Sequence, residues 1–313
     1  MRHVKVNGVE VAYEVVGRGE PILFIHGAHI ADAMRPLVED PALDRFQRIR
    51  YHRRGVGGSS CPPEARATAL AVHAEDAVGL LEHLGVDRAH VVGHSSGGSI
   101  ALEIASRHPT RVSSLVLLEP ALLMVPSGAA FVDLVMPLVG RYEVGDAESG
   151  VHGFLALVGD RDWRNAIEWT VPGGIAQAVK DAATFFVSEL PAVSDWTFGP
   201  EQATAITCPV LSVLGSKTSP LFVEGHELLH EWFPQCHDAD IPDASHLLQM
   251  EAPGPVAAAI AAFVPTLSEH HRCGSRETRR IDGLAREASR TRTTATCAQT
   301  RGEGVPVTRG RAG

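Results

Sequence analysis

Cysteine is scarce in this 313-residue sequence. Its cysteines include no Cys-x-x-Cys pair and no Cys/His spacing of the kind that holds zinc. There are five of them, Cys61, Cys208, Cys236, Cys273 and Cys297. We therefore expect reduced thiols rather than a disulfide framework, and the sequence predicts neither a metal ion nor a cofactor.

A continuous apolar stretch is also lacking at the N-terminus. Residues 1–17 alternate apolar and polar side chains, which is unlike the apolar run that a signal peptide needs. Apolar residues make up 44% and charged residues 21% of the chain, close to the averages of globular proteins. We therefore expect a cytoplasmic protein with no membrane partner. The net charge of -9 argues against a nucleic-acid partner.

Charge is unevenly distributed along the chain. Residues 266–313 hold ten Arg against five Asp or Glu, and they contain almost no large apolar side chains. Such a segment cannot bury enough surface to offset the entropy that is lost on ordering. We therefore predict a disordered Arg-rich tail over 266–313.

Short apolar runs alternate with helical patterns through most of the chain. The apolar runs, short as buried parallel strands are, are 21–26, 47–52, 89–93, 112–118, 209–215 and a weaker 236–241. Helical spacing of apolar residues is found over 67–84, 97–108, 221–233 and 255–263. An Asn7-Gly8 turn within 3–16 predicts an antiparallel hairpin at the start. This alternation predicts an α/β fold with helices on both faces of a mostly parallel sheet.

The alternation is interrupted between Glu119 and Thr207. Gly, Pro and aromatic residues mix there with helical stretches, and the length suits an inserted helical cap rather than a loop. The predicted organisation is a core over 1–119 and 208–265, a cap over 120–207 and the tail over 266–313.

A G-x-S-x-G motif, Gly93-His94-Ser95-Ser96-Gly97, runs from the apolar segment 89–93 straight into a predicted helix. A serine hydroxyl attacks a carbonyl only when it is exposed, so it sits on a sharp strand-to-helix turn with tiny residues two positions to either side. The helix also directs free N–H groups at the place where an oxyanion develops. The motif predicts Ser95 as a nucleophile and the Ser96 N–H as an oxyanion donor.

In this context the sequence resembles the α/β-hydrolase superfamily, over about Val4 to Phe263. The resemblance implies an eight-stranded, mostly parallel sheet with an inserted helical cap. His26-Gly27-Ala28 stands where the family's oxyanion loop begins, which implies the Ala28 N–H as the second donor. In the loop after the fourth strand, His52 stands where the family usually has Asp, and a structural role is implied for Arg54.

The resemblance also implies a base and an acid. His246, in the segment 243–248 before the final predicted helix, lies where the family has its catalytic His, and a neutral imidazole suits this proton transfer. The usual position of the acid, in the turn 215–220, has no carboxylate. A branch of the superfamily places the acid one strand earlier, where Glu119 follows an apolar run, so we predict Glu119. The alternative is that Glu119 pairs with an arginine and the acid is absent.

The substrate is predicted only as a class. Candidate wall residues are His26 and the large cap side chains Met124, Phe131, Trp163, Trp169, Phe185, Phe186 and Trp196. An apolar pocket favours small hydrophobic carboxylic esters or lactones, cleaved through an acyl-enzyme. Three alternatives use the same triad: cofactor-free haloperoxidase (perhydrolase) activity, carbon–carbon bond hydrolysis and hydroxynitrile cleavage. A ligand-binding receptor with little or no turnover is a further alternative.

Overall fold

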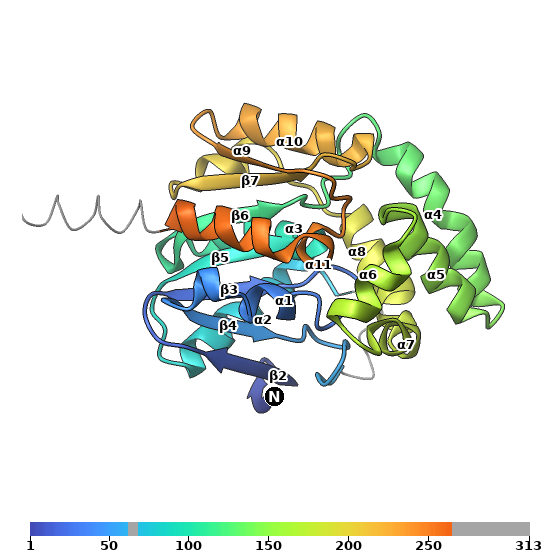
Figure 1. Ribbon diagram of the computed structural model, residues 1–313, viewed down its shortest axis with the longest axis horizontal. Helices are drawn as coiled ribbons and strands as arrows, with labels where there is room; N and C mark the ends of the chain where they lie inside the picture. The colour runs from blue at the N-terminus through green and yellow to red at the C-terminus, as the bar shows by residue number, and fades with distance from the viewer. Residues whose placement is uncertain (62–67, 265–313) are drawn as a thin grey trace, which may run out of the picture. The chain divides into compact units, whose positions relative to one another are not determined.

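The computed structural model describes residues 1–61 and 68–264 (Figure 1). The tail predicted over 266–313 lies outside the described residues, and so does the start of the helix predicted over 67–84. The domain limits at 120, 207 and 265 stay predictions.

A single eight-stranded sheet runs through the described part of the chain in the order β1-β2-β4-β3-β5-β6-β7-β8. Its strands are β1 (Arg2–Val6), β2 (Val9–Val16), β3 (Pro21–Ile25), β4 (Gln47–Tyr51), β5 (Ala89–His94), β6 (Val112–Leu118), β7 (Val210–Gly215) and β8 (His237–Ile241). β1 and β2 pair antiparallel, β2 pairs antiparallel with β4, and the other neighbours are parallel. The predicted α/β sheet is therefore confirmed.

The N-terminal hairpin follows from its turn residues. Asn7 and Gly8 both have positive φ, of 45° and 83°, and Val6 pairs with Val9 across the turn. Such two-residue turns need positive φ at both positions, and Asn-Gly meets that need at little cost. The hairpin adds β1 and β2 to one edge of the parallel strands.

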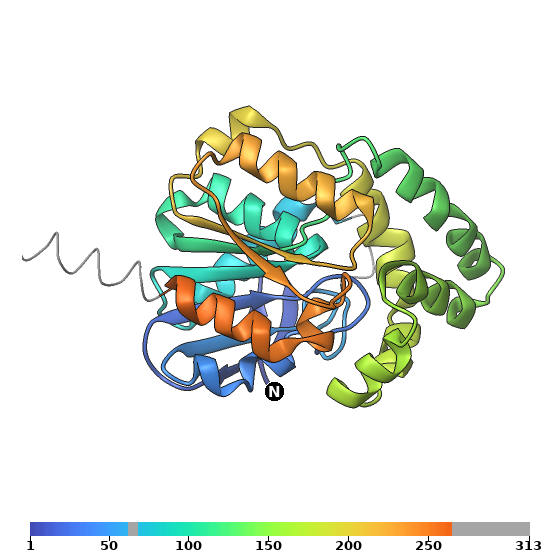
Figure 2. The same ribbon diagram turned by 45° about the horizontal axis from the view of Figure 1, so that its top comes forward.

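Helices cover both faces of the sheet. Those of the core are α1 (Arg35–Val38), α2 (Leu70–His83), α3 (Ser96–Arg107), α10 (Pro220–Trp232) and α11 (Leu248–Glu251), with the short turns η1 (Pro41–Leu43) and η2 (Pro109–Arg111) and a last helical segment over 253–264. Figures 1 and 2 show the last segment in front of the sheet and α3 behind it. α2 packs on α3, and α10 packs on β7.

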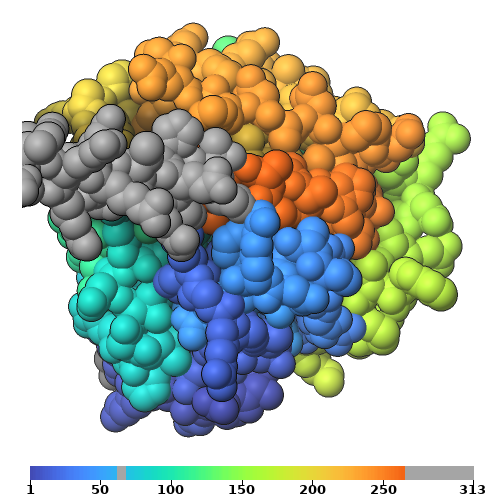
Figure 3. All heavy atoms as spheres, turned by 60° about the vertical axis from the view of Figure 1, so that its left-hand side comes forward, coloured from blue at the N-terminus to red at the C-terminus, as the bar shows by residue number. Residues whose placement is uncertain are grey.

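The last helical segment also contacts the first third of the chain. Figure 3 shows it beside the segment that holds α1 and η1. Arg45, which follows η1, donates a hydrogen bond of 2.7 Å to the carbonyl oxygen of Ala261. The last helical segment is therefore tied to the loop that leads into β4.

Between β6 and β7 the chain leaves the sheet and forms a run of helices, here called the insertion. They are α4 (Gly128–Glu143), α5 (Ala147–Val158), α6 (Trp163–Thr170), α7 (Gly174–Lys180), η3 (Thr184–Glu189), α8 (Leu190–Ser194) and α9 (Pro200–Thr204). η3 is a π-helical turn, a rare form that appears frequently at functional sites. Helices α4 to α7 lie together at one end of the sheet (Figure 1).

The insertion has its own apolar cluster, separate from the one around the sheet. Its members include Phe154, Ile167 and Phe185, and it also takes in Ile30 and Leu247 from loops of the core. Because core side chains belong to this cluster, the insertion is anchored on the end of the sheet from which those loops emerge. Within 1–61 and 68–264, none of the helices has the length and apolar character to cross a bilayer.

Candidate active site

Ser95 lies on the sharp turn between β5 and α3. Its φ of 54° and ψ of -125° are strained for a residue with a side chain. Strain of this kind persists only when the surroundings hold it in place, and it is often found at functional sites. Here the Ser95 N–H donates to the carbonyl of Leu118, and the Ala121 N–H donates to the carbonyl of Ser95.

The two glycines of the motif are required by close backbone approach. A Cβ atom on Gly93 would lie 2.3 Å from the carbonyl oxygen of Gly97, and one on Gly97 would lie 2.4 Å from that of Ile25. Both contacts are with backbone, which cannot swing aside. The helix α3 therefore starts close to β5 and β3 only because these positions lack side chains.

His246 and Glu119 are hydrogen-bonded. His246 follows β8, Glu119 follows β6, and His246 Nδ1 lies 2.7 Å from Glu119 Oε2. Both side chains are buried, with 3% and 2% of their residue surfaces exposed. An imidazole whose Nδ1–H donates to a carboxylate keeps its Nε2 free as an acceptor. This tautomer is the one that a general base needs.

The turn after β7, which has no carboxylate of its own, binds the carboxylate of Glu119. The Gly215 N–H donates to Oε1 at 2.7 Å, and the Thr218 hydroxyl donates to Oε2 at 2.8 Å. Glu119 itself has a positive φ of 45°, which turns the chain out of β6. Glu119, which follows β6, thus places its carboxylate beside the end of β7. The turn 215–220 supplies hydrogen-bond donors there instead of an acid.

Burial sets the ionisation of this pair. It lowers the pKa of His246 to about 3 and raises the pKa of Glu119 to about 7, although the donors Gly215 and Thr218 act in the opposite direction on the carboxyl. The imidazole is therefore neutral at physiological pH. A neutral imidazole is able to accept a proton from a nearby hydroxyl.

Two further side chains hold His246 in place, and neither was predicted from the sequence. The ring of Phe222, on α10, stacks on the imidazole with centroids 3.7 Å apart. His94, the second residue of the G-x-S-x-G motif, places Nε2 2.8 Å from the backbone oxygen of His246, while its Nδ1 lies 3.2 Å from Gln249 Nε2. The motif allows any residue at the position of His94, so nothing in the sequence indicated this role.

The predicted oxyanion donors lie at the same place. Ala28 and Ser96 line one cavity together with Ser95 and His246. Ser96 is the first residue of α3, so its N–H has no carbonyl partner within its own helix. The Ser96 N–H is therefore available to donate into the cavity, and Ala28 lines the same cavity.

The cavity is mostly apolar, and the insertion forms much of its wall. Its apolar lining residues are Ala121, Leu123, Phe131, Phe154, Val158, Phe185, Leu190, Val193, Leu221 and Phe222. A smaller cavity that also touches Ser95 and His246 is lined by more polar groups, among them His94 and Gln249. Ser95 and His246 thus lie where an apolar and a more polar space meet.

Only two of the predicted wall residues line the larger cavity, Phe131 and Phe185. The structure places the others elsewhere. Met124 is 40% exposed and Trp169 is 88% exposed. The remaining three have other partners: Trp163 stands beside His152, Phe186 stacks on Tyr142, and Trp196 donates to Glu103. Residue type alone did not separate aromatic side chains of the insertion core from those of the cavity.

His26 is also placed elsewhere than its predicted position in the substrate pocket. Its Nδ1 lies 2.7 Å from the carbonyl oxygen of Gly27, and its Nε2 accepts the backbone N–H of Arg53 at 3.0 Å. Burial is the largest of the causes that lower its pKa. With both ring nitrogens bonded inside the protein, His26 links the loops that follow β3 and β4 and has no nitrogen left for a substrate.

In the loop after β4, His52 stands where the family usually has Asp, and it contacts a carboxylate from another loop. His52 accepts the Gly58 N–H on Nδ1 at 2.9 Å, and its Nε2 lies 3.0 Å from Asp32 Oδ1. A carboxylate from another loop therefore supplies the negative charge that His52 lacks. Arg54 makes a two-pronged ion pair with Asp76 of α2, at 2.6 and 2.7 Å, in a structural position.

Arg53 and Glu189 form a buried ion pair between the core and the insertion. Arg53 Nη2 lies 2.6 Å from Glu189 Oε1, and it also donates to the carbonyl of Gly27 in the oxyanion loop at 2.8 Å. The two side chains are 1% and 2% exposed. Glu189 ends the π-helical turn η3 and lines the cavity. The sequence offered no signal for this pair, because its members are far apart in the chain.

Replacing Glu189 with alanine is expected to lower the free energy of unfolding by about 3 to 5 kcal/mol, because the Arg53 charge would stay buried without a partner. Chemical denaturation of wild type and variant measures this difference. The matched control is Glu39→Ala, which breaks the exposed pair of Arg35 and Glu39 (3.6 Å) and should cost less than about 1 kcal/mol. Equal losses in the two variants would show that Arg53 finds water or another partner.

The chain belongs to the α/β hydrolase fold family, whose model matches residues 20–253. The chain is 35% identical to a putative non-heme haloperoxidase of Mycobacterium phage D29 over 127 residues. This matched stretch covers 39% of this chain and 44% of that protein. The chain spans less than half of the length of curated relatives that it matches.

Solved structures match over a larger share of the chain. The enol-lactonase of Burkholderia xenovorans LB400 has a TM-score of 0.72 at 21% identity, with 84% of this chain and 100% of that chain covered. Est816, described as an N-acyl homoserine lactone degrading enzyme, has a TM-score of 0.63 at 26% identity, with 84% of this chain and 100% of that chain covered.

Proposed function

We propose that this protein is a serine hydrolase that cleaves small hydrophobic carboxylic esters or lactones through an acyl-enzyme. The observation that carries the proposal is the 2.7 Å hydrogen bond between His246 and Glu119, at an apolar cavity that Ser95 and His246 both line. The catalytic triad is Ser95, His246 and Glu119. The proposed oxyanion hole is the backbone N–H groups of Ala28 and Ser96, and the insertion is the proposed cap.

The proposed reaction has two steps. His246 Nε2 takes the proton of Ser95 as the hydroxyl oxygen attacks the carbonyl carbon, and the two backbone N–H groups bind the resulting oxyanion. His246 then gives this proton to the leaving alcohol, which leaves an acyl group on Ser95. Water, deprotonated by His246, releases the acid and restores the serine. Throughout, Glu119 accepts the Nδ1–H and stabilises the charge on the imidazolium.

The lining of the cavity supports the substrate class. A wall of alkyl and phenyl side chains stabilises short alkyl or aryl groups, and it offers few partners to sugars or peptides. Similarity to a lactone-degrading enzyme at 26% identity points the same way. Hydrolysis of a series of p-nitrophenyl esters of increasing chain length tests the proposal. Turnover that is greatest for short chains supports it, and an absence of turnover across the series contradicts it.

Perhydrolysis on the same triad is the second candidate, favoured by the similarity to a putative haloperoxidase. Formation of peracetic acid from acetate and hydrogen peroxide distinguishes this reaction from hydrolysis. Carbon–carbon bond hydrolysis and hydroxynitrile cleavage would need substrates of those classes for their test. The receptor alternative rested on a missing acid, and the contact of Glu119 with His246 argues against it.

The rate of ester hydrolysis is expected to fall on the acid side of about pH 7. The pKa of Glu119 is raised to about 7 and that of His246 lowered to about 3, so the carboxylate of the pair takes up the first proton as the pH falls. A protonated Glu119 no longer orients the imidazole for proton transfer. The value of kcat/KM should therefore decrease about tenfold for each pH unit below that point. A flat profile from neutrality to the usual pKa of glutamate would contradict this assignment.

A further inference from the structure

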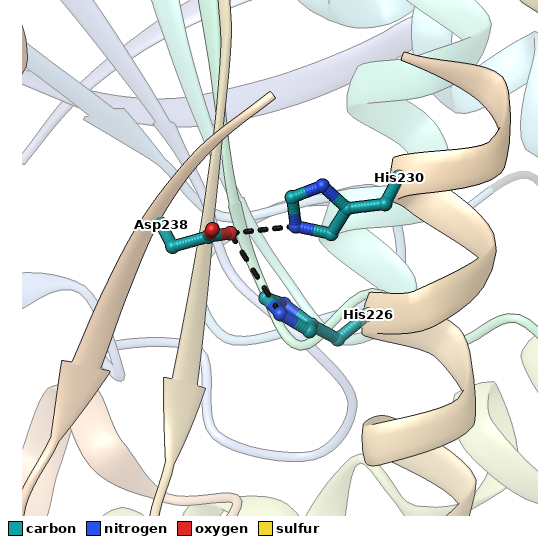
Figure 4. A group of neighbouring side chains, drawn as sticks. All are labelled: His226, His230 and Asp238. Atoms are coloured by element: carbon teal, nitrogen blue, oxygen red, sulfur yellow. Dashed lines mark hydrogen bonds and ion pairs between the residues drawn. The ribbon is translucent and has the colours of Figure 1, made fainter. Parts of the chain in front are cut away.

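A second group of side chains with clear chemistry lies on the sheet away from Ser95. His226 and His230 are one turn apart on α10, and Asp238 is near the start of β8. One ligand atom from each lies within 4.8 Å of the other two. Figure 4 shows both imidazoles on the side of α10 that faces the carboxylate. Histidines four residues apart on a helix are a common way to present two metal ligands.

The distances within the group lie close to those that a bound metal ion would impose. His230 Nε2 is 2.7 Å from Asp238 Oδ1, but His226 Nε2 is 3.7 Å from the same oxygen, which is too long for a hydrogen bond. Two ligand atoms on a tetrahedral zinc ion, each bonded at about 2.0 to 2.1 Å, stand about 3.3 to 3.4 Å apart. The two observed distances lie on either side of that value, so small side-chain movements would bring both histidines and the carboxylate to one ion.

An independent feature is the partner of the other His226 nitrogen. His226 Nδ1 lies 2.8 Å from the hydroxyl oxygen of Ser212, a buried residue of β7 that is paired in register with Asp238. A histidine that binds a metal through one nitrogen commonly donates its other N–H to an oxygen atom, and this contact fixes the ring. Ser212 would hold His226 in that way, with Nε2 directed at Asp238.

We propose that His226, His230 and Asp238 bind a divalent transition-metal ion of the zinc type. Imidazole and carboxylate ligands suit such ions, and a water molecule would complete a four-coordinate site. The ion would link α10 to β8. α10 carries Phe222, which stacks on His246, and β8 leads to the loop that carries His246. The site therefore has a structural role, as a clamp between the two elements that hold the proposed base.

Equilibrium dialysis of the full chain against Zn²⁺ tests the site. The chain has sixteen His and five Cys, some of them outside the described residues, so the readout is the difference between variants. The variants His230→Ala and Asp238→Asn should each bind one equivalent less than wild type. Ser212→Ala should weaken this equivalent at least about tenfold. The matched control is His108→Ala, which removes a surface histidine paired with Glu75 at 3.0 Å, and it should bind as wild type does.

Thermal unfolding gives the second readout. Zn²⁺ should raise the Tm of wild type and of His108→Ala, because binding to the folded state alone stabilises it, and the rise should be smaller in His230→Ala. None of the three side chains is fully buried, since His226 and His230 are partly exposed and Asp238 is exposed, so the variants are expected to fold. Equal zinc stoichiometry in wild type and His230→Ala, or no bound zinc in wild type, would overturn the proposal.

Discussion

Replacing Ser95 with alanine is expected to reduce kcat for ester hydrolysis by about 10⁴-fold or more. The substitution removes the proposed nucleophile and leaves the rest of the cavity in place, so only the binding and oxyanion contributions to the rate would remain. Steady-state hydrolysis of a short p-nitrophenyl ester measures the loss. A fluorophosphonate probe, which reacts with activated serines, should label wild type and not the variant.

A serine within α3, the helix that follows Ser95, provides the control. Ser106 donates its hydroxyl to the carbonyl of Glu103, within α3, and Ser106→Ala should keep the wild-type rate. If Ser95→Ala were to retain turnover while its fold is intact, another group would have to be the nucleophile and the proposed mechanism would be wrong.

Replacing Glu119 with glutamine is expected to reduce kcat by about 10³- to 10⁴-fold, with little change in size. The three hydrogen-bond partners of the carboxylate, Gly215, Thr218 and His246, are placed as donors. A glutamine amide that turned its NH₂ toward His246 would donate to Nδ1 and place the imidazole proton on Nε2. That tautomer cannot accept a proton from Ser95. Turned the other way, the NH₂ would meet the Gly215 N–H, donor against donor.

Thr218→Val is the control for this experiment. It removes one donor to Glu119 but keeps the carboxylate and its contact with His246, so a loss of no more than about tenfold is expected. A loss in Glu119→Gln no larger than that of Thr218→Val would mean that Glu119 only fills space, and the receptor alternative would regain support. Circular dichroism of each variant separates loss of rate from loss of fold.

The sheet was predictable because its signals are local. The strands β3, β5, β6 and β7 are short apolar runs, the hairpin has an Asn-Gly turn, and the motif around Ser95 joins strand to helix over a few residues. The run predicted over 236–241 has only a weak apolar character, yet β8 forms there by pairing along β7. The strand predicted from this weak pattern therefore forms where pairing with β7 supports it.

The contacts around the candidate active site were harder to predict from the sequence. The choice of Glu119 required comparison with a branch of a family, because the turn that binds its carboxylate is almost one hundred residues further along the chain. The partners of Arg53 and His94 are more distant still, at Glu189 and His246. Such contacts depend on how the strand ends and the insertion pack together, and periodic patterns in the sequence do not predict that packing.

The buried pair of Arg53 and Glu189 limits which insertions from related proteins could replace the insertion of this chain. The hydrogen-bond partners of the Glu119 carboxylate, Gly215, Thr218 and His246, belong to the core, so a foreign insertion joined after Leu123 would leave those contacts intact. The same exchange would delete Glu189 and leave the Arg53 guanidinium buried beside the oxyanion loop. A working chimera would therefore have to carry an acidic residue at that position, or lose Arg53 as well.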